Sequence, residues 1–182
     1  MIPSSAKNEE LRSFVRKHRN EDPVKILLQK RGDQSWDWRW IAQQIEGYQI
    51  AKKKIPEFSE KQIHFPKRLS IEQSSSEMTA RFKAELFEGK RFLDLSGGFG
   101  IDFLYISQKF EKSVYVEKDE DLCELISLNH HLLEFTNKIK IVNKKAEKFL
   151  KKDEKEYDLI FIDPARRDAQ GKKVFRFSDC EP

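Results

Sequence analysis

The sequence predicts an α/β protein in which a small N-terminal helical domain precedes a Rossmann-like parallel sheet with its helices. From Arg91 onward, short segments rich in β-branched and aromatic residues alternate with helical stretches. Successive units of this kind are typical of a parallel sheet with right-handed crossovers. Before residue 69 the apolar residues recur at helical spacing instead. We therefore expect a helical domain with a linker over residues 1–68 and a Rossmann-like domain over residues 69–182.

Three helices are predicted in the first domain. Residues 7–19 and 22–30 are expected to be short helices, the second starting at Asp22-Pro23, an N-cap carboxylate followed by proline. A helix of about 18 residues follows from Trp36, because apolar residues recur there every three or four positions. Its tryptophans could stack on nucleobases, but packing in a small helical core is the favoured interpretation. The stretch between Pro56 and Pro66 is the expected linker.

Four strands are predicted in the second domain, at residues 91–95, 113–117, 139–142 and 157–162. Each is short and bounded by turn-forming or charged residues. The chain ends about twenty residues after the fourth strand. A doubly wound sheet usually has more strands, so we expect an incomplete sheet that belongs to a longer protein.

The composition excludes several classes of protein. The chain has 182 residues, of which 36% are charged and 38% hydrophobic, and it has no apolar run long enough to cross a membrane. The first residues contain no signal peptide, so a cytoplasmic protein is expected. Two cysteines and four scattered histidines predict neither a disulfide nor a metal site. The oligomeric state stays open.

The basic residues are unevenly distributed. Residues 1–90 hold 18 Lys and Arg against 13 Asp and Glu, or +5, whereas residues 91–182 hold 17 against 18, or −1. A partner with phosphate groups would be attracted to the N-terminal half. A run such as Lys52–Lys54 is also typical of a solvated helix end.

A glycine-rich turn follows the first predicted strand. Gly97, Gly98 and Gly100 allow the backbone to turn tightly and to approach a ligand, and Glu117 ends the next strand, where an acid can bind ribose hydroxyls. An ordinary turn with a surface glutamate is the alternative. The spacing differs from the G-x-G-x-x-G of dinucleotide sites. Asp94, ahead of the turn, suits a ligand with an ammonium group, which indicates S-adenosylmethionine (SAM).

These stretches resemble a known family. DLSGGFG (94–100) resembles motif I of class I SAM-dependent methyltransferases, with Ser96 in place of the usual first glycine, and VEKD (116–119) resembles motif II. IDPAR (162–166) lies where motif IV is expected. More closely, LSIEQSSSEMTARFKAELF (69–87), DPARRDAQGKKV (163–174) and DCEP (179–182) resemble bacterial class I methyltransferases that carry a THUMP-like C-terminal domain. The resemblance implies that this C-terminal part is absent here.

The resemblance also implies the cofactor contacts. Motif I should hold the methionine portion, Glu117 the ribose, and Lys118 should lie beside the adenine. Asp102 could hold the ammonium group or simply stabilise a helix N-terminus. Lys145 stands where many relatives have an aspartate for the adenine, which leaves the backbone of Ala146. The expected cofactor-binding residues are Gln73, Ser74, Ser75, Asp94, Ser96, Gly97, Gly98, Gly100, Asp102, Glu117, Lys118 and Ala146.

The segment EQSSSE (72–77) has a second interpretation. Ser74 and Glu77 have the spacing of a capping box for the helix that follows. In related methyltransferases the corresponding segment crosses the mouth of the cofactor site.

Asp163, Pro164 and Arg166 are the expected catalytic residues. In amino-methylating relatives an acid and a proline carbonyl accept hydrogen bonds from the target amine, and an aromatic ring stacks on the base. Arg166 replaces that ring here. A guanidinium can stack on a base or bind phosphate, so the acceptor atom stays open. A surface ion pair is the alternative for Arg166 and Arg167.

The sequence thus predicts a SAM-dependent methyltransferase. RNA is the favoured substrate, because of the THUMP-like association and the basic N-terminal half. The alternatives are a methyltransferase of a small molecule or protein, and a non-catalytic module that binds a nucleotide or RNA.

Overall fold

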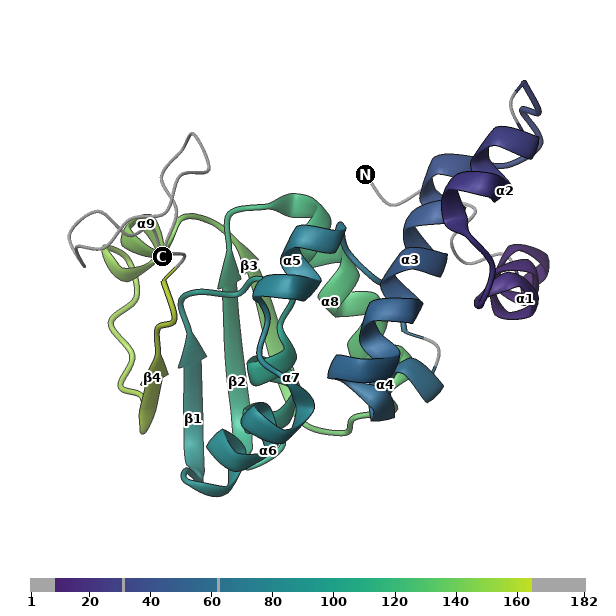
Figure 1. Cartoon of the computed structure of the whole chain (residues 1–182). Coiled ribbons are helices and arrows are strands. Elements are labelled where there is room, and N and C mark those ends of the chain that lie inside the picture. The colour runs from purple at the N-terminus through teal and green to yellow at the C-terminus, as the bar shows by residue number, and fades with distance from the viewer. Residues whose placement is uncertain (1–8, 31, 62, 165–182) are drawn as a thin grey trace.

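The computed structural model describes residues 9–30, 32–61 and 63–164. Helices α1–α6 precede the first strand, and the remaining helices alternate with strands (Figure 1). In chain order the elements are α1 Glu9–His18, α2 Pro23–Gln29, α3 Trp38–Lys54, α4 Pro56–Glu60, α5 Arg68–Gln73, α6 Glu77–Glu85, β1 Gly89–Asp94, α7 Ile101–Ser107, β2 Phe110–Glu117, α8 Glu120–Leu132, β3 Lys138–Asn143, α9 Ala146–Leu150 and β4 Leu159–Phe161.

The four described strands form one parallel sheet in the order β3-β2-β1-β4. The chain moves outward from β1 to β3 and then crosses back to pair β4 with β1. All four strands end at the same edge of the sheet, and the segments that follow them meet there. This arrangement confirms the predicted Rossmann-like fold.

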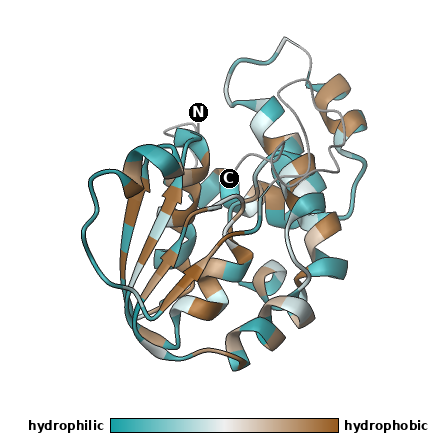
Figure 2. Cartoon of the chain, turned by 90° about the vertical axis from the view of Figure 1, so that its left-hand side faces the viewer, coloured by the Kyte–Doolittle hydropathy of each residue, from teal (hydrophilic) through white to brown (hydrophobic). Residues whose placement is uncertain are grey.

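Alternating side chains cover the two faces of the sheet. Phe92 and Tyr115 join a large hydrophobic cluster with α3, α4 and the helices α5–α8 on one face. Leu93 follows Phe92 in β1, and Val114 precedes Tyr115 in β2. Both therefore lie on the other face of the sheet, where they join a smaller cluster with α9. Figure 2 shows the hydrophobic colouring along the strands and on the helix surfaces that face them. Burial on both faces explains the consecutive buried residues Phe92–Asp94 of β1 and Ser113–Val116 of β2.

The helical region has a core of its own at its N-terminal end. Leu11, Ile26, Trp38, Trp40, Ile41 and Ile45 form a cluster that is separate from both sheet clusters. The predicted start of α2 is confirmed, since the Asp22 carboxylate accepts hydrogen bonds from the backbone of Val24 and Lys25. Helix α3 begins at Trp38, two residues after the predicted position, because Asp37 caps it. The domain boundary at residue 68 stays a prediction.

The segment Ile63–Pro66, here called the strap, connects the helical region to the sheet region. Its residues are buried although they belong to no helix or strand. Two amide side chains satisfy its backbone. Gln44 of α3 accepts from the N–H of Phe65 at 2.8 Å and donates to its carbonyl at 2.9 Å, and Asn129 of α8 binds both backbone groups of His64 in the same way at 2.8 and 2.9 Å.

Within the described residues, no helix is long and apolar enough to span a membrane. The same part of the chain contains no group of three metal-ligating side chains. Cys123 is buried and forms no disulfide with any described residue.

Candidate functional site: the carboxyl edge of the sheet

The site begins at Asp94, the last residue of β1, which is only 1% exposed. One carboxylate oxygen accepts hydrogen bonds from the Ser96 N–H at 2.8 Å, the Ser96 hydroxyl at 3.0 Å and the Gly97 N–H at 3.1 Å. Burial raises the pKa of Asp94 to about 7 against the opposing effect of these hydrogen bonds, and nearby Asp102 raises it further. Asp94 can therefore exchange a proton near neutral pH.

The glycine turn brings its backbone against Glu117 of β2. Gly97 has a φ of 35°, and a Cβ atom placed on it would lie 2.7 Å from the Cβ of Glu117. Gly98 has a φ of 62°, and of the described residues a Cβ there would meet only the carbonyl of Ser96, at 3.6 Å. The first glycine is required by close packing, whereas the second leaves space over the turn.

Glu117 is held by the backbone at both carboxylate oxygens. Its Oε2 accepts from the Gly98 N–H at 2.8 Å and its Oε1 from the Asp119 N–H at 2.8 Å. Since each carboxylate oxygen has two acceptor positions, Glu117 can still accept hydrogen bonds from a ligand. The contact places the predicted ribose-binding acid directly beside the predicted methionine-binding turn.

Asp102, in the first turn of α7, forms the third acidic position. Its Oδ2 accepts from the Ser75 hydroxyl at 2.8 Å and pairs with the Lys83 ammonium at 3.1 Å. Its Oδ1 is buried and has no hydrogen-bond partner among the described residues. A buried carboxylate oxygen in this state is a ready acceptor for a ligand's N–H group.

Lys83 was not found by sequence reasoning. Its ammonium binds both Asp102 and the Ser75 hydroxyl, the latter at 3.0 Å, and lies 5.0 Å from the Phe161 ring centroid. It thus joins α6, α7 and β4. No local signal marks it, because the contact depends on how α6 packs against α7.

Ser74 is placed differently from Ser75. Its hydroxyl donates to the carbonyl of Ile71 at 2.9 Å and so caps the C-terminal end of α5. Helix α6 begins at Glu77 with Ser76 as its N-cap, accepting from the Thr79 N–H at 3.2 Å. The expected capping box of Ser74 and Glu77 is therefore wrong.

Gln73, Lys118 and Ala146 lie further from this centre. Gln73 ends α5 and is exposed. The carbonyls of Glu117 and Lys118 both accept from the Asn143 side-chain amide, at 3.1 and 3.0 Å. Asn143 was also missed, although it pairs with Glu117 in the sheet register. The Ala146 side chain is buried in the cluster on the far face, which leaves its backbone for any ligand contact.

The segment after β4 reaches the glycine turn through one hydroxyl. The Asp163 N–H donates to the Ser96 oxygen at 2.9 Å, and the same hydroxyl donates to Asp94. Asp163 is exposed and Pro164 is half-buried. Arg166 and Arg167 lie outside the described residues. Gly100 ends the turn as the residue before α7.

Comparisons with known proteins agree with this architecture. The model of the family described as conserved hypothetical protein 95 matches residues 51–177. The crystal structure of a putative methyltransferase from Porphyromonas gingivalis W83 is 28% identical, with a TM-score of 0.79 over 99% of this chain and 45% of that chain. The chain thus spans less than half the length of that relative.

Two further solved structures are less similar. A conserved hypothetical protein from Streptococcus pyogenes is 28% identical over 43% of this chain and 50% of its own, with a TM-score of 0.40. A coclaurine N-methyltransferase bound to N-methylheliamine and SAH is 15% identical over 84% of this chain and 48% of its own, with a TM-score of 0.38. No curated protein matches the sequence. Since the family model covers more than half of the residues, the chain belongs to the conserved hypothetical protein 95 family.

Proposed function

We propose that this chain carries the cofactor site of a class I SAM-dependent methyltransferase that acts on RNA. The observation that carries the proposal is the pair of carboxylates beside the glycine turn, of which Asp94 is buried and Asp102 is partly buried. Asp94 and Asp102 are close enough for Asp102 to raise the pKa of Asp94, and Asp102 has an unpartnered oxygen. A cation bound near both would relieve their repulsion.

The residues at this edge fit SAM. Its ammonium group suits Asp94 and Asp102, and its ribose hydroxyls suit the free acceptor positions of Glu117. The open side of Gly98 leaves room for a ligand over the turn. Asn143 and Lys118 are the neighbouring polar groups for the adenine. Bound SAM would supply an activated methyl group, so the protein has mainly to orient the acceptor and exclude water.

Asp163 and the Pro164 carbonyl are the proposed groups that orient the acceptor. Both can accept a hydrogen bond, and the tie from the Asp163 N–H to Ser96 holds the segment beside the glycine turn. Arg166 is proposed to contact the substrate through its guanidinium. These roles rest on the resemblance of motif IV and on this one contact.

Membership of the family and the similarity to the Porphyromonas putative methyltransferase support the enzymatic part of the proposal. The RNA substrate rests on the basic excess of residues 1–90 and on the resemblance to enzymes with a THUMP-like domain.

Titration calorimetry of the full-length protein with SAM and with NAD tests the cofactor. We expect SAM to bind and NAD not to bind. Glu117→Ala should weaken SAM binding because it removes the acceptor for the ribose hydroxyls. Glu124→Gln, an exposed site on α8, is the matched control and should bind as the wild type does. Absence of SAM binding would refute the proposal.

The substrate requires a second experiment. RNA from cells with and without the gene can be compared by mass spectrometry, and one methyl mark should be missing without it. A methyltransferase of a small molecule or a protein would leave RNA marks unchanged, and its substrate binding would vary little with salt.

A further inference from the structure

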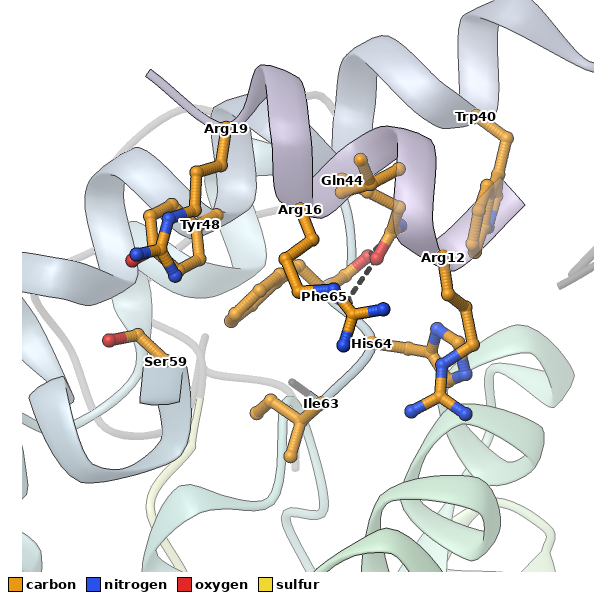
Figure 3. Close-up of a pocket in the computed structure, with 11 residues that line it drawn as sticks. Arg12, Arg16, Arg19, Trp40, Gln44, Tyr48, Ser59, Ile63, His64 and Phe65 are labelled. Atoms are coloured by element: carbon orange, nitrogen blue, oxygen red, sulfur yellow. Dashed lines mark hydrogen bonds between the residues drawn. The ribbon is translucent and has the colours of Figure 1, made fainter. Parts of the chain in front are cut away.

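A cavity lies between α1, α3 and the strap, away from the carboxyl edge of the sheet. Its volume is about 50 Å³, which suits a group of a few heavy atoms and is too small for a whole nucleoside. Arg12, Arg16 and Arg19 line it from one side (Figure 3). The spacing of these arginines, i, i+4 and i+7, puts them on one face of α1 and its C-terminal extension.

The arginines differ in their contacts. Arg16 pairs with Glu9 at 3.1 Å and Arg12 approaches Glu9 at 3.7 Å, while the guanidinium of Arg19 lies 4.8 Å from the ring centroid of Tyr48. Glu9 has a side chain that is 70% exposed. An exposed pair of this kind contributes little, so an incoming anion can displace Glu9 at small cost.

The floor of the cavity is held by hydrogen bonds and includes an imidazole ring. His64 and Phe65 of the strap are fixed by Asn129 and Gln44. Burial, with a smaller effect from Arg12, lowers the pKa of His64 to about 4, so its imidazole is neutral at physiological pH. A neutral imidazole has one N–H to donate. Trp40, whose ring lies 5.7 Å from that of His64, closes the cavity on the α3 side.

The position of the cavity relates it to the proposed cofactor site. The strap leads directly into α5, and Ser75, which binds Asp102, follows α5. A group held in the cavity is therefore fixed at one end of the segment that borders the cofactor site. The end of α1 is fixed as well, since the Gln49 amide donates to the carbonyls of Arg19 and Glu21 at 3.1 and 2.7 Å.

We propose that this arginine cavity binds a backbone phosphate of the RNA substrate. Guanidiniums bind phosphate oxygens bidentately, and three of them line this cavity. The small volume admits the phosphate, while the rest of the strand runs over the open rim. The proposal rests on RNA being the substrate, and it assigns to the helical region the task of holding the strand.

Binding of a fluorescein-labelled single-stranded RNA to the full-length protein, measured by anisotropy over a salt series, tests the proposal. In a plot of the logarithm of the binding constant against the logarithm of the salt concentration, each arginine that contacts a phosphate contributes about 0.7 to the steepness of the slope. At 0.1 M salt, loss of that contribution lowers the affinity about fivefold. Arg12→Ala, Arg16→Ala and Arg19→Ala should each lower slope and affinity by up to that amount, and Arg16→Lys should retain most of the slope. Arg39→Ala removes the same charge from an exposed position outside the cavity and should leave both nearly unchanged.

Two controls separate this proposal from the proposed function. SAM binding by each variant should equal that of the wild type, which also shows that the variant is folded. If SAM binds but the arginine variants bind RNA as the wild type does, the cavity proposal is refuted and the methyltransferase stands. If SAM does not bind while the arginine dependence of RNA binding persists, the methyltransferase fails and the cavity proposal stands. Arginine-dependent binding of inorganic phosphate or of anionic lipid vesicles without binding of RNA also refutes the cavity proposal.

Discussion

The affinity for SAM should rise with pH near neutrality if Asp94 receives the ammonium group. The pKa of Asp94 is raised by burial to about 7, so the carboxyl is mostly protonated at pH 6 in the free protein. Only the ionised form attracts a cation strongly. The ionised fraction is about 9% at pH 6 and about 50% at pH 7, so the affinity should increase about fivefold over this interval. Binding at pH 7 should release about half a proton from Asp94.

Calorimetry in two buffers of different ionisation enthalpy measures both the affinity for SAM and the number of protons released on binding. Asp94→Asn keeps an oxygen that can accept from Ser96 and Gly97 but removes the titration, so its affinity should be low and independent of pH between 5.5 and 7. Glu124→Gln should keep the wild-type pH dependence. A wild-type affinity that does not change over this range, or an unchanged slope in Asp94→Asn, would refute the role of Asp94.

Three further predictions concern stability. Gly97→Ala should lower the free energy of unfolding by at least about 1 kcal/mol and abolish SAM binding, because its Cβ would collide with Glu117 at a positive φ; urea unfolding and calorimetry measure the two effects. Gln44→Leu should cost about 1–3 kcal/mol, since the buried N–H of Phe65 loses its acceptor; an unchanged urea midpoint would contradict this. The pKa of Asp158 is lowered by two backbone N–H groups at the start of β1, so its stabilising effect exists above pH 3.8 and is lost as the pH falls through the lowered pKa. In thermal unfolding, the Asp158→Asn variant should lose less stability than the wild type as the pH falls through this range.

The features that could be predicted are those that depend on residues close together in the sequence. The strands were found because β-branched and aromatic residues gather in short runs, and the start of α2 was found because Asp22-Pro23 is a local cap. The glycine turn and Glu117 were found for the same reason, since both lie at the ends of predicted strands. Local chemistry was sufficient wherever a feature needs no distant contact.

The remaining features depend on tertiary packing. Three consecutive serines, Ser74 to Ser76, offer similar local N-caps for α6. In the structure Ser76 is the N-cap, while Ser75 binds Asp102 and Glu77 accepts from the Glu57 N–H. Lys83 reaches the site only because α6 packs against α7. The arginine cavity needs α1 and the strap to lie side by side, which no periodicity in the sequence indicates.

The hydroxyl of Ser96 has a consequence for how this family can vary. Ser96 stands where the resembling methyltransferases usually have glycine, and its hydroxyl joins the buried Asp94 to the backbone of Asp163. A relative with glycine at this position cannot form the link and must hold the segment after β4 by other contacts. Substitutions at position 96 and in the segment after β4 should therefore occur together among homologous sequences. The serine that departs from the usual motif would then be explained by the residues of that segment.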